Sequence, residues 1–183
     1  MRLDGPSREA LQPAIDTLTE LALSLGAKDV LLADTDERKE SIWNARGAFL
    51  EAIKGSTSTM DECDVVVPRD VIPAFVHKSV EIGKTLGVRI RSFGHAGDGN
   101  LHIYVCRDEM PEAEWKEKVA SAMQQLYDEA RSLRGEISGE HGVGHAKKGF
   151  LRESVGEKQI ALMRGIKAVF DPRGILNPGK VVE

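Results

Sequence analysis

The sequence predicts an α+β fold, with helices packed on one face of an antiparallel or mixed sheet. Short runs of β-favouring residues alternate with longer segments in which apolar residues recur at helical spacing. Two of the short runs follow each other across a glycine-rich turn, which is typical of a β-hairpin. A strand pair that follows such an alternation indicates an α+β architecture.

The N-terminal quarter of the chain predicts two helices and one short strand. Apolar residues at helical spacing indicate a helix over residues 11–25, which Gly26 can end. Residues 30–33 resemble a short buried strand, and residues 41–53 predict a second helix. The polar segment 55–60 is loop-like.

A strand and an amphipathic helix come next. Residues 64–67 predict a strand that Pro68 ends, and residues 72–86 have the apolar spacing of a helix. Asp70 is a candidate cap for this helix, and Gly87 is a candidate stop.

The rest of the chain predicts the hairpin, two helices and a tail. The hairpin strands are residues 88–93 and 101–105. The longest helix is expected over residues 111–133. A final helix is expected from a capping box at Ser154, with an apolar face running to residue 170, and an extended tail follows it.

Composition limits the class of protein. The 183 residues fit one domain, are 41% apolar and 30% charged, and carry a net charge of −4. Without a Lys/Arg run to neutralise phosphates, a general nucleic-acid binder is disfavoured. No transmembrane segment is expected, and Cys63 and Cys106 are expected to be reduced, buried thiols of a cytoplasmic protein.

Four of the five histidines lie in two glycine-rich stretches, residues 92–105 and 138–148. A tight turn between His95 and His102 places them on facing strands, so both can point to the same side of the sheet. With Glu140 they form a three-ligand set with an open position, the pattern of a catalytic metal site. This set does not choose among Zn²⁺, Mn²⁺ and Fe²⁺. The alternative is that the glycines serve the hairpin and His102 is a hydrogen-bonded core histidine.

Neither stretch contains one of the well-defined nucleotide-binding motifs. The glycines of residues 94–99 do not have the spacing of a dinucleotide-binding loop, and residues 142–149 do not end as a P-loop does. Lys147 and Lys148 are expected to be solvated, although they could attract an acidic substrate.

Five segments carry a resemblance to a known family: IWNAR (42–46), DVVVP (64–68), GHAGDGNLH (94–102), SGEHGVG (138–144) and FDPRGILNPGK (170–180). They resemble the C-terminal cap domain of FAD-linked oxidases of the vanillyl-alcohol oxidase class. Within that class they are most similar to the D-lactate, glycolate and D-2-hydroxyglutarate dehydrogenases. The resemblance implies a ferredoxin-like cap built on an antiparallel sheet.

The resemblance also implies roles for seven residues of this chain. They are His95, His102 and Glu140 as metal ligands, His141 as the general base, Arg46 as the group that binds a substrate carboxylate, Asn100 as an orienting group, and Asn177 as a residue packing toward the flavin domain.

The function implied is that of the substrate- and metal-binding part of an FAD-dependent enzyme that oxidises a D-2-hydroxy acid to a 2-oxo acid. The expected cofactors are FAD and a divalent metal, Zn or Mn. Residues 1–183 are expected to form the cap domain, without the FAD-binding domain and the first cap strands. FAD would be bound mainly by that absent domain or subunit, so the isolated chain is expected to be inactive.

Two positions bear on the substrate. Where the hydroxyglutarate enzymes have a threonine and a lysine for the distal carboxylate, this chain has Leu50 and Glu62. The difference favours lactate- or glycolate-like monoacids. Missing strands would also expose a sheet edge, which favours homo-oligomers. The alternatives are a stand-alone metal- or partner-binding module without flavin chemistry, and a purely structural domain.

Overall fold

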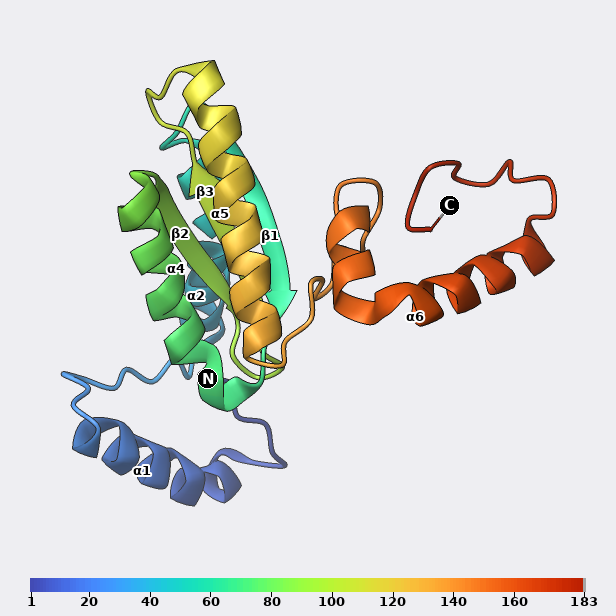
Figure 1. Ribbon diagram of the computed structural model, residues 1–183. Coiled ribbons are helices and arrows are strands. Elements are labelled where there is room, and N and C mark those ends of the chain that lie inside the picture. The colour runs from blue at the N-terminus through green and yellow to red at the C-terminus, as the bar shows by residue number, and fades with distance from the viewer. Residues whose placement is uncertain (183) are drawn as a thin grey trace. The chain divides into compact units, whose positions relative to one another are not determined.

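The computed structural model describes residues 1–182, which form two compact units that divide after Ala48 (Figure 1). The first unit contains helices α1 (Arg8–Ser24) and α2 (Asp36–Gly47). Each begins at a hydroxyl residue, Ser7 or Thr35, whose side chain accepts a backbone N–H of the first turn.

Two predictions for the first unit need correction. Residues 30–33 form no strand, because no partner strand pairs with them among the described residues, and Leu31 is 85% exposed. The helix expected over residues 41–53 begins earlier, at Asp36, because Thr35 caps it, and it breaks at Ala48 before a separate short helix. The helix ended near Gly26 is confirmed.

The second unit contains the sheet. Its elements are α3 (Phe49–Lys54), β1 (Met60–Val66), the 3-10 turn η1 (Arg69–Val71), α4 (Ile72–Leu86), β2 (Arg89–His95), β3 (Asn100–Cys106), α5 (Glu112–Ser132) and α6 (Lys148–Phe170). Both strand pairs are antiparallel, in the order β1-β3-β2. This βαββα order is that of a ferredoxin-like unit, and the Val66–Glu136 bridge stands where its fourth strand would pair. The α+β prediction is confirmed.

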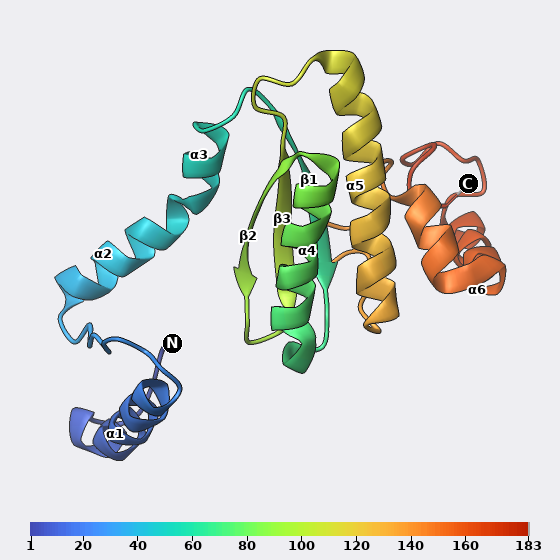
Figure 2. The same cartoon turned by 60° about the vertical axis from the view of Figure 1, so that its left-hand side comes forward.

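Helices α4 and α5 cover one face of the sheet, as both ribbon views show (Figures 1 and 2). The core between them includes Phe75 from α4, Leu126 from α5 and Ile103 from β3, all fully buried. Because side chains alternate along a strand, the neighbours of Ile103 face away from these helices. The other face of the sheet is therefore available to polar residues.

The start of α4 differs from the prediction. Asp70 lies in η1, and α4 begins at Ile72 without a side-chain cap in the part of the chain that the structure describes. Its end is as predicted, since Gly87 takes the left-handed conformation at the C-cap.

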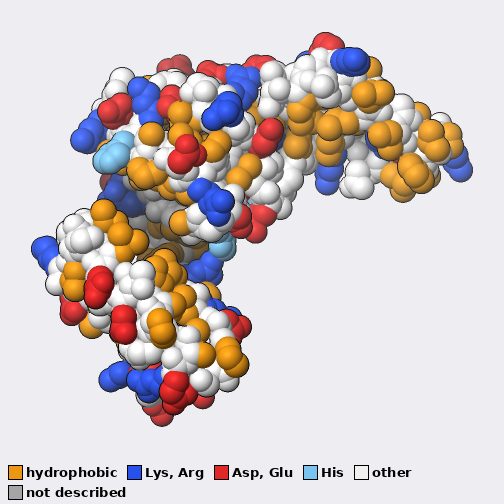
Figure 3. Space-filling model, turned by 90° about the horizontal axis from the view of Figure 1, so that it is seen from below, with side chains coloured by type: hydrophobic (Ala, Val, Ile, Leu, Met, Phe, Trp, Pro, Cys, Tyr) orange, Lys and Arg blue, Asp and Glu red, His pale blue; other side chains and the backbone are white. Residues whose placement is uncertain are grey.

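Because α6 is interrupted at Gly156, the longest uninterrupted helix among the described residues is α5, as predicted. Helix α6 itself differs from the prediction. It begins at Lys148, and the capping box expected at Ser154 is replaced by a kink at Gly156, whose φ is 77°. The predicted apolar face is buried only at Ile160, while Ile166 and Phe170 are 62% and 79% exposed. Figure 3 shows hydrophobic side chains gathered over α6, at the right of the view. The tail beyond it turns repeatedly rather than extending.

Two composition-based expectations can be checked. Cys63 and Cys106 are both buried and unpaired, and burial raises the pKa of the Cys63 thiol to about 12. Among the described residues, none of the helices combines the length and hydrophobicity that a membrane crossing needs.

Candidate metal centre

The candidate site lies on the sheet face opposite α4 and α5. The β2–β3 register pairs Phe93 with His102 and His95 with Asn100, so that these side chains share one face. The ring centroids of His95 and His102 lie 5.9 Å apart. The prediction that the hairpin aims both histidines to the same side is confirmed.

Loop 138–141 brings Glu140 to this pair. Its Oε1 lies 3.0 Å from Nε2 of the buried His102 and 3.8 Å from Nε2 of His95. Two ligands of a tetrahedral zinc ion are about 3.3 Å apart, given bonds of about 2.0–2.1 Å. The observed separations bracket this value, so the three donor atoms suit one ion with small adjustments.

His102 has carboxylates at both ring nitrogens. Its Nδ1 lies 3.0 Å from Glu62 Oε1, and its Nε2 faces Glu140. Because an ionised carboxylate only accepts hydrogen bonds, Nδ1 carries the proton, and a positive charge is needed between Nε2 and Glu140. A metal ion or a second proton supplies it. The first case matches the carboxylate–histidine–metal arrangement common in proteins.

Glu62 connects several groups of the site. Its Oε1 also accepts a hydrogen bond from the Tyr104 hydroxyl (2.9 Å) and lies 3.5 Å from His141 Nδ1. Burial, followed by the contact with Glu62, raises the pKa of Tyr104, which keeps the phenol a neutral donor. Glu62, His102 and His141 form a second group of potential ligands that overlaps the first. Because Tyr104 and both histidines converge on one oxygen, Glu62 is better suited to orient the rings than to hold an ion.

Two buried acceptors beside the site have no hydrogen-bond partner among the described residues. They are Oδ1 of Asn100 and Oδ1 of Asp64. Buried polar atoms normally have a protein or water partner, and orphaned ones often mark a functional site. This pair of oxygens is consistent with a site for a hydrated ion or a polar ligand.

The structure brings together most of the predicted site residues. His95, His102 and Glu140 converge, and the ring centroid of His141 lies 5.0 Å from that of His102. Asn100 is buried at the start of β3. The metal and catalytic roles of all these residues stay predictions.

Two predicted residues belong to other parts of the chain. Arg46 belongs to α2 in the other unit, where its guanidinium carbon lies 5.4 Å from the centre of the Trp43 ring. Asn177 lies in the tail at a φ of 46°, and its carbonyl accepts a hydrogen bond from Lys180. Their predicted contacts with substrate and flavin domain stay predictions as well.

Sequence reasoning missed Asp64 and Lys147. Lys147 was expected to be solvated, but it is 9% exposed and its ammonium lies 3.3 Å from the Asp64 carboxylate. A signal for Asp64 was present, because it alternates with Glu62 on β1 and so shares the polar face with it. The sequence offers no comparable signal for Lys147, which reaches the sheet only through the tertiary fold.

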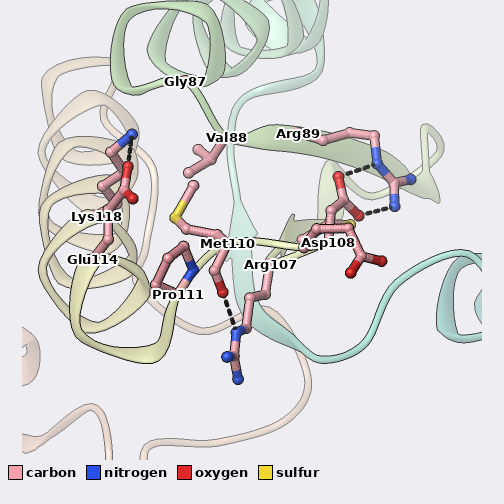
Figure 4. Close-up of a pocket in the computed structure, with 11 residues that line it drawn as sticks. Gly87, Val88, Arg89, Arg107, Asp108, Met110, Pro111, Glu114 and Lys118 are labelled. Atoms are coloured by element: carbon pink, nitrogen blue, oxygen red, sulfur yellow. Dashed lines mark hydrogen bonds and ion pairs between the residues drawn. The ribbon is translucent and has the colours of Figure 1, made fainter.

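A cavity of about 310 Å³ lies at the opposite end of the hairpin, beside Arg89 (Figure 4). The cationic side chains around it already have partners. Arg89 pairs with Asp108, Lys118 with Glu114, and Arg107 donates to the Met110 carbonyl. The His-rich end of the sheet is therefore the better candidate site.

Comparison with known proteins gives matches along nearly the whole chain. Residues 1–181 match the family described as FAD linked oxidases, C-terminal domain. A D-lactate dehydrogenase of Anaerostipes hadrus is 49% identical over 97% of this chain and 38% of its own length. The glycolate oxidase subunit GlcD of Bacillus subtilis is 35% identical over 97% of the chain and 37% of its length.

A D-2-hydroxyglutarate dehydrogenase of Stutzerimonas stutzeri is 30% identical over 99% of the chain and 39% of its own length. The chain thus spans less than two fifths of the length of the relatives it matches. The extent of the family match identifies this chain: it belongs to the FAD-linked oxidases, as a C-terminal domain of that family.

Proposed function

We propose that this chain is the substrate- and metal-binding part of an FAD-dependent enzyme that oxidises a D-2-hydroxy acid to a 2-oxo acid. The observation that supports it best is the convergence of His95, His102 and Glu140 on one point, with His141 beside them. The names of the relatives support the reaction class, because all three are hydroxy-acid dehydrogenases or oxidases.

The ion would be held by Nε2 of His95, Nε2 of His102 and a carboxylate oxygen of Glu140. Two imidazoles and a carboxylate suit Zn²⁺ or Mn²⁺. When bound there, such an ion acts as a Lewis acid that lowers the pKa of a substrate hydroxyl. The Glu62 contact fixes the tautomer of His102, so that Nε2 keeps its lone pair.

His141 would accept the hydroxyl proton. Its side chain is about half exposed, so a substrate can reach it, and Glu62 beside Nδ1 leaves Nε2 available as the acceptor. Asn100 would orient the substrate, and Arg46 would bind its carboxylate with the two parallel hydrogen bonds of a guanidinium. FAD, held mainly outside this chain with Asn177 facing the flavin domain, would accept the hydride.

The substrate class follows from charge. The Glu62 carboxylate lies beside both His102 and His141. A second carboxylate on the substrate would meet like charge there, so we expect a lactate- or glycolate-like monoacid rather than a dicarboxylate. We place the enzyme in the cytoplasm, because both cysteines are unpaired and buried, as is common in a reducing compartment.

A second candidate is a metal-binding module that works without flavin chemistry. One observation favours it: all three proposed ligands lie in the unit that begins at Phe49, so metal binding needs no residue of the first unit. Activity of a longer protein that contains the flavin part separates the two candidates.

The first experiment measures metal stoichiometry after the protein is loaded with Zn²⁺ or Mn²⁺ and desalted. We expect about one ion per chain in the wild type and in His77→Ala, since His77 is an exposed histidine of α4. We expect no retained ion in His102→Ala. We expect the same result in His95→Ala, which replaces a more exposed histidine. Equal retention in His95→Ala and wild type would contradict the ligand set.

The second experiment uses a longer protein with the flavin part restored. We expect flavin reduction by D-lactate or glycolate in preference to D-2-hydroxyglutarate, and its loss in His141→Ala. Full turnover of His141→Ala would reject the role of this residue, and preference for the dicarboxylate would reject the substrate class.

A further inference from the structure

Asp64 is a buried carboxylate that loop 138–141 surrounds. Its side chain is 1% exposed, and its Oδ2 lies within 3.0–3.2 Å of three successive backbone nitrogens, those of residues 139–141. The Ser138 hydroxyl (3.2 Å) and the Lys147 ammonium (3.3 Å) donate to the same oxygen. Successive backbone N–H groups that converge in this way form an anion-binding concavity, and here the anion belongs to the protein itself.

The groups that contact Oδ2 of Asp64 are all hydrogen-bond donors. Burial raises the pKa of Asp64, but the backbone N–H of His141 and the Lys147 ammonium outweigh it and hold the pKa below its ordinary value. Lys147 also donates to the Asp64 carbonyl at 3.2 Å, which ties the start of α6 to β1. The negative charge and its donors therefore form one buried network.

Loop 138–141 packs closely against the sheet at Gly139. A side-chain carbon on Gly139 would come within 2.0 Å of Asn100 Oδ1 and 2.8 Å of Asp64 Oδ1. Only glycine fits between these atoms. Asp64 therefore restrains the loop backbone in two ways: its Oδ2 accepts hydrogen bonds from the loop, and its Oδ1 packs against Gly139.

We propose that Asp64, together with Lys147, is a positioning residue that sets the backbone of Glu140 and His141 at the candidate metal centre. Asp64 acts through the loop: its bonds go to the backbone of these residues, while Glu140 Oε1 reaches His102 Nε2. The proposal rests on the proposed function in that it assigns Glu140 to the metal. The anchoring of the loop can be tested without a metal.

The first test is amide hydrogen exchange of residues 139–141 in Asp64→Asn, with no metal added. Asp61→Asn is the matched control, because Asp61 is an exposed acid of the same strand. We expect faster exchange of these three amides in Asp64→Asn and unchanged exchange in the control. A folded Asp64→Asn protein with wild-type exchange in the loop would overturn the proposal.

The second test is a cycle of metal affinities, measured by calorimetry with Zn²⁺. We expect Asp64→Asn to weaken binding about 10- to 100-fold, as is typical of groups that orient a ligand. In a Glu140→Gln background the same substitution should have little further effect, because Asp64 acts through Glu140. An equal loss in both backgrounds would indicate a general structural effect and would overturn the positioning role.

Two arrangements keep the test decisive. If Asp64→Asn does not fold, Lys147→Met removes one donor to the carboxylate, and we expect a smaller loss in the same direction, with the exposed Lys158→Met as its control. If the wild type binds no Zn²⁺ or Mn²⁺, the proposed function fails and so does a role in metal positioning. Hydrogen exchange then still shows whether the loop is anchored by Asp64.

Discussion

Two aspartates of the second unit have bonded carboxylates at opposite ends of the sheet, but at different depths. Asp64 holds loop 138–141 from inside the protein, with a side chain that is 1% exposed. Asp108 lies beside loop 56–58, where its carboxylate pairs with Arg89 and its side chain is 39% exposed. We expect the two carboxylates to differ in their contribution to stability, because water can replace the partner of Asp108 but not those of Asp64.

The largest expected effect concerns the two aspartates themselves. Asp64→Ala leaves the Lys147 ammonium buried without its carboxylate, so we expect the free energy of unfolding to fall by about 3–5 kcal/mol. Asp108→Ala breaks a partly exposed pair, and we expect a loss of about 1 kcal/mol or less. Urea unfolding of both variants measures this difference. Equal losses would show that depth does not separate the two anchors.

Two glycines near the candidate site, Gly139 and Gly97, differ in how closely other atoms pack against them. Gly139→Ala forces a carbon against Asn100 and Asp64, and such overpacking typically costs about 1–3 kcal/mol. The hairpin glycine Gly97 has no atom within 4 Å of the same position among the described residues. Gly97→Ala should therefore stay within about 0.5 kcal/mol of wild type. Thermal unfolding of the two variants tests this, and a stable Gly139→Ala would contradict the close packing of the loop.

The Glu62 contact can be tested without disturbing either anchor. Glu62→Gln weakens the acceptor that fixes His102, so we expect Zn²⁺ affinity to fall about 10- to 100-fold. Glu81→Gln is the control, since Glu81 is an exposed acid of α4. Calorimetry measures both affinities. Unchanged binding in Glu62→Gln would mean that His102 does not need this carboxylate for its orientation.

The smallest expected effect is a pH dependence at the exposed anchor. The hydrogen bond from Arg89 lowers the pKa of Asp108 below its ordinary value near 3.8. The stability that this interaction supplies is therefore full above the unfolded pKa and is lost as pH falls through the folded one. Comparing unfolding free energies of wild type and Asp108→Asn from pH 7 to 2, we expect the difference to shrink below about pH 4. A difference that stays constant would contradict the lowered pKa.

Much of the site could be predicted because its chemistry is local. His95 and His102 lie seven residues apart across a tight turn, and the period of two along a strand is enough to place them on one face. Glu140 was added to the predicted site because the second glycine-rich stretch has a similar composition to the first. Lys147 could not be predicted, because its burial depends on Asp64, 83 residues away in the sequence.

Errors in the predicted fold have the same origin. Residues 30–33 have the composition of a strand, but a strand forms only where a partner supplies hydrogen bonds to its edges, and none does among the described residues. The apolar spacing after Ile160 correctly indicates a helix, yet spacing does not show what covers the face of that helix. In the described residues this face stays exposed at Ile166 and Phe170.

By itself the sequence determined the order of the main sheet elements, the hairpin and the two glycine stretches that carry the histidines. These follow from periodicity and turn chemistry, which act over a few residues. Only the tertiary structure decided that Asp64 is the centre of loop 138–141, that Glu62 contacts two histidines, and that Lys147 is buried. The physical reason is that burial and ion pairing depend on atoms brought together from distant parts of the chain. The local sequence around one partner does not indicate the other.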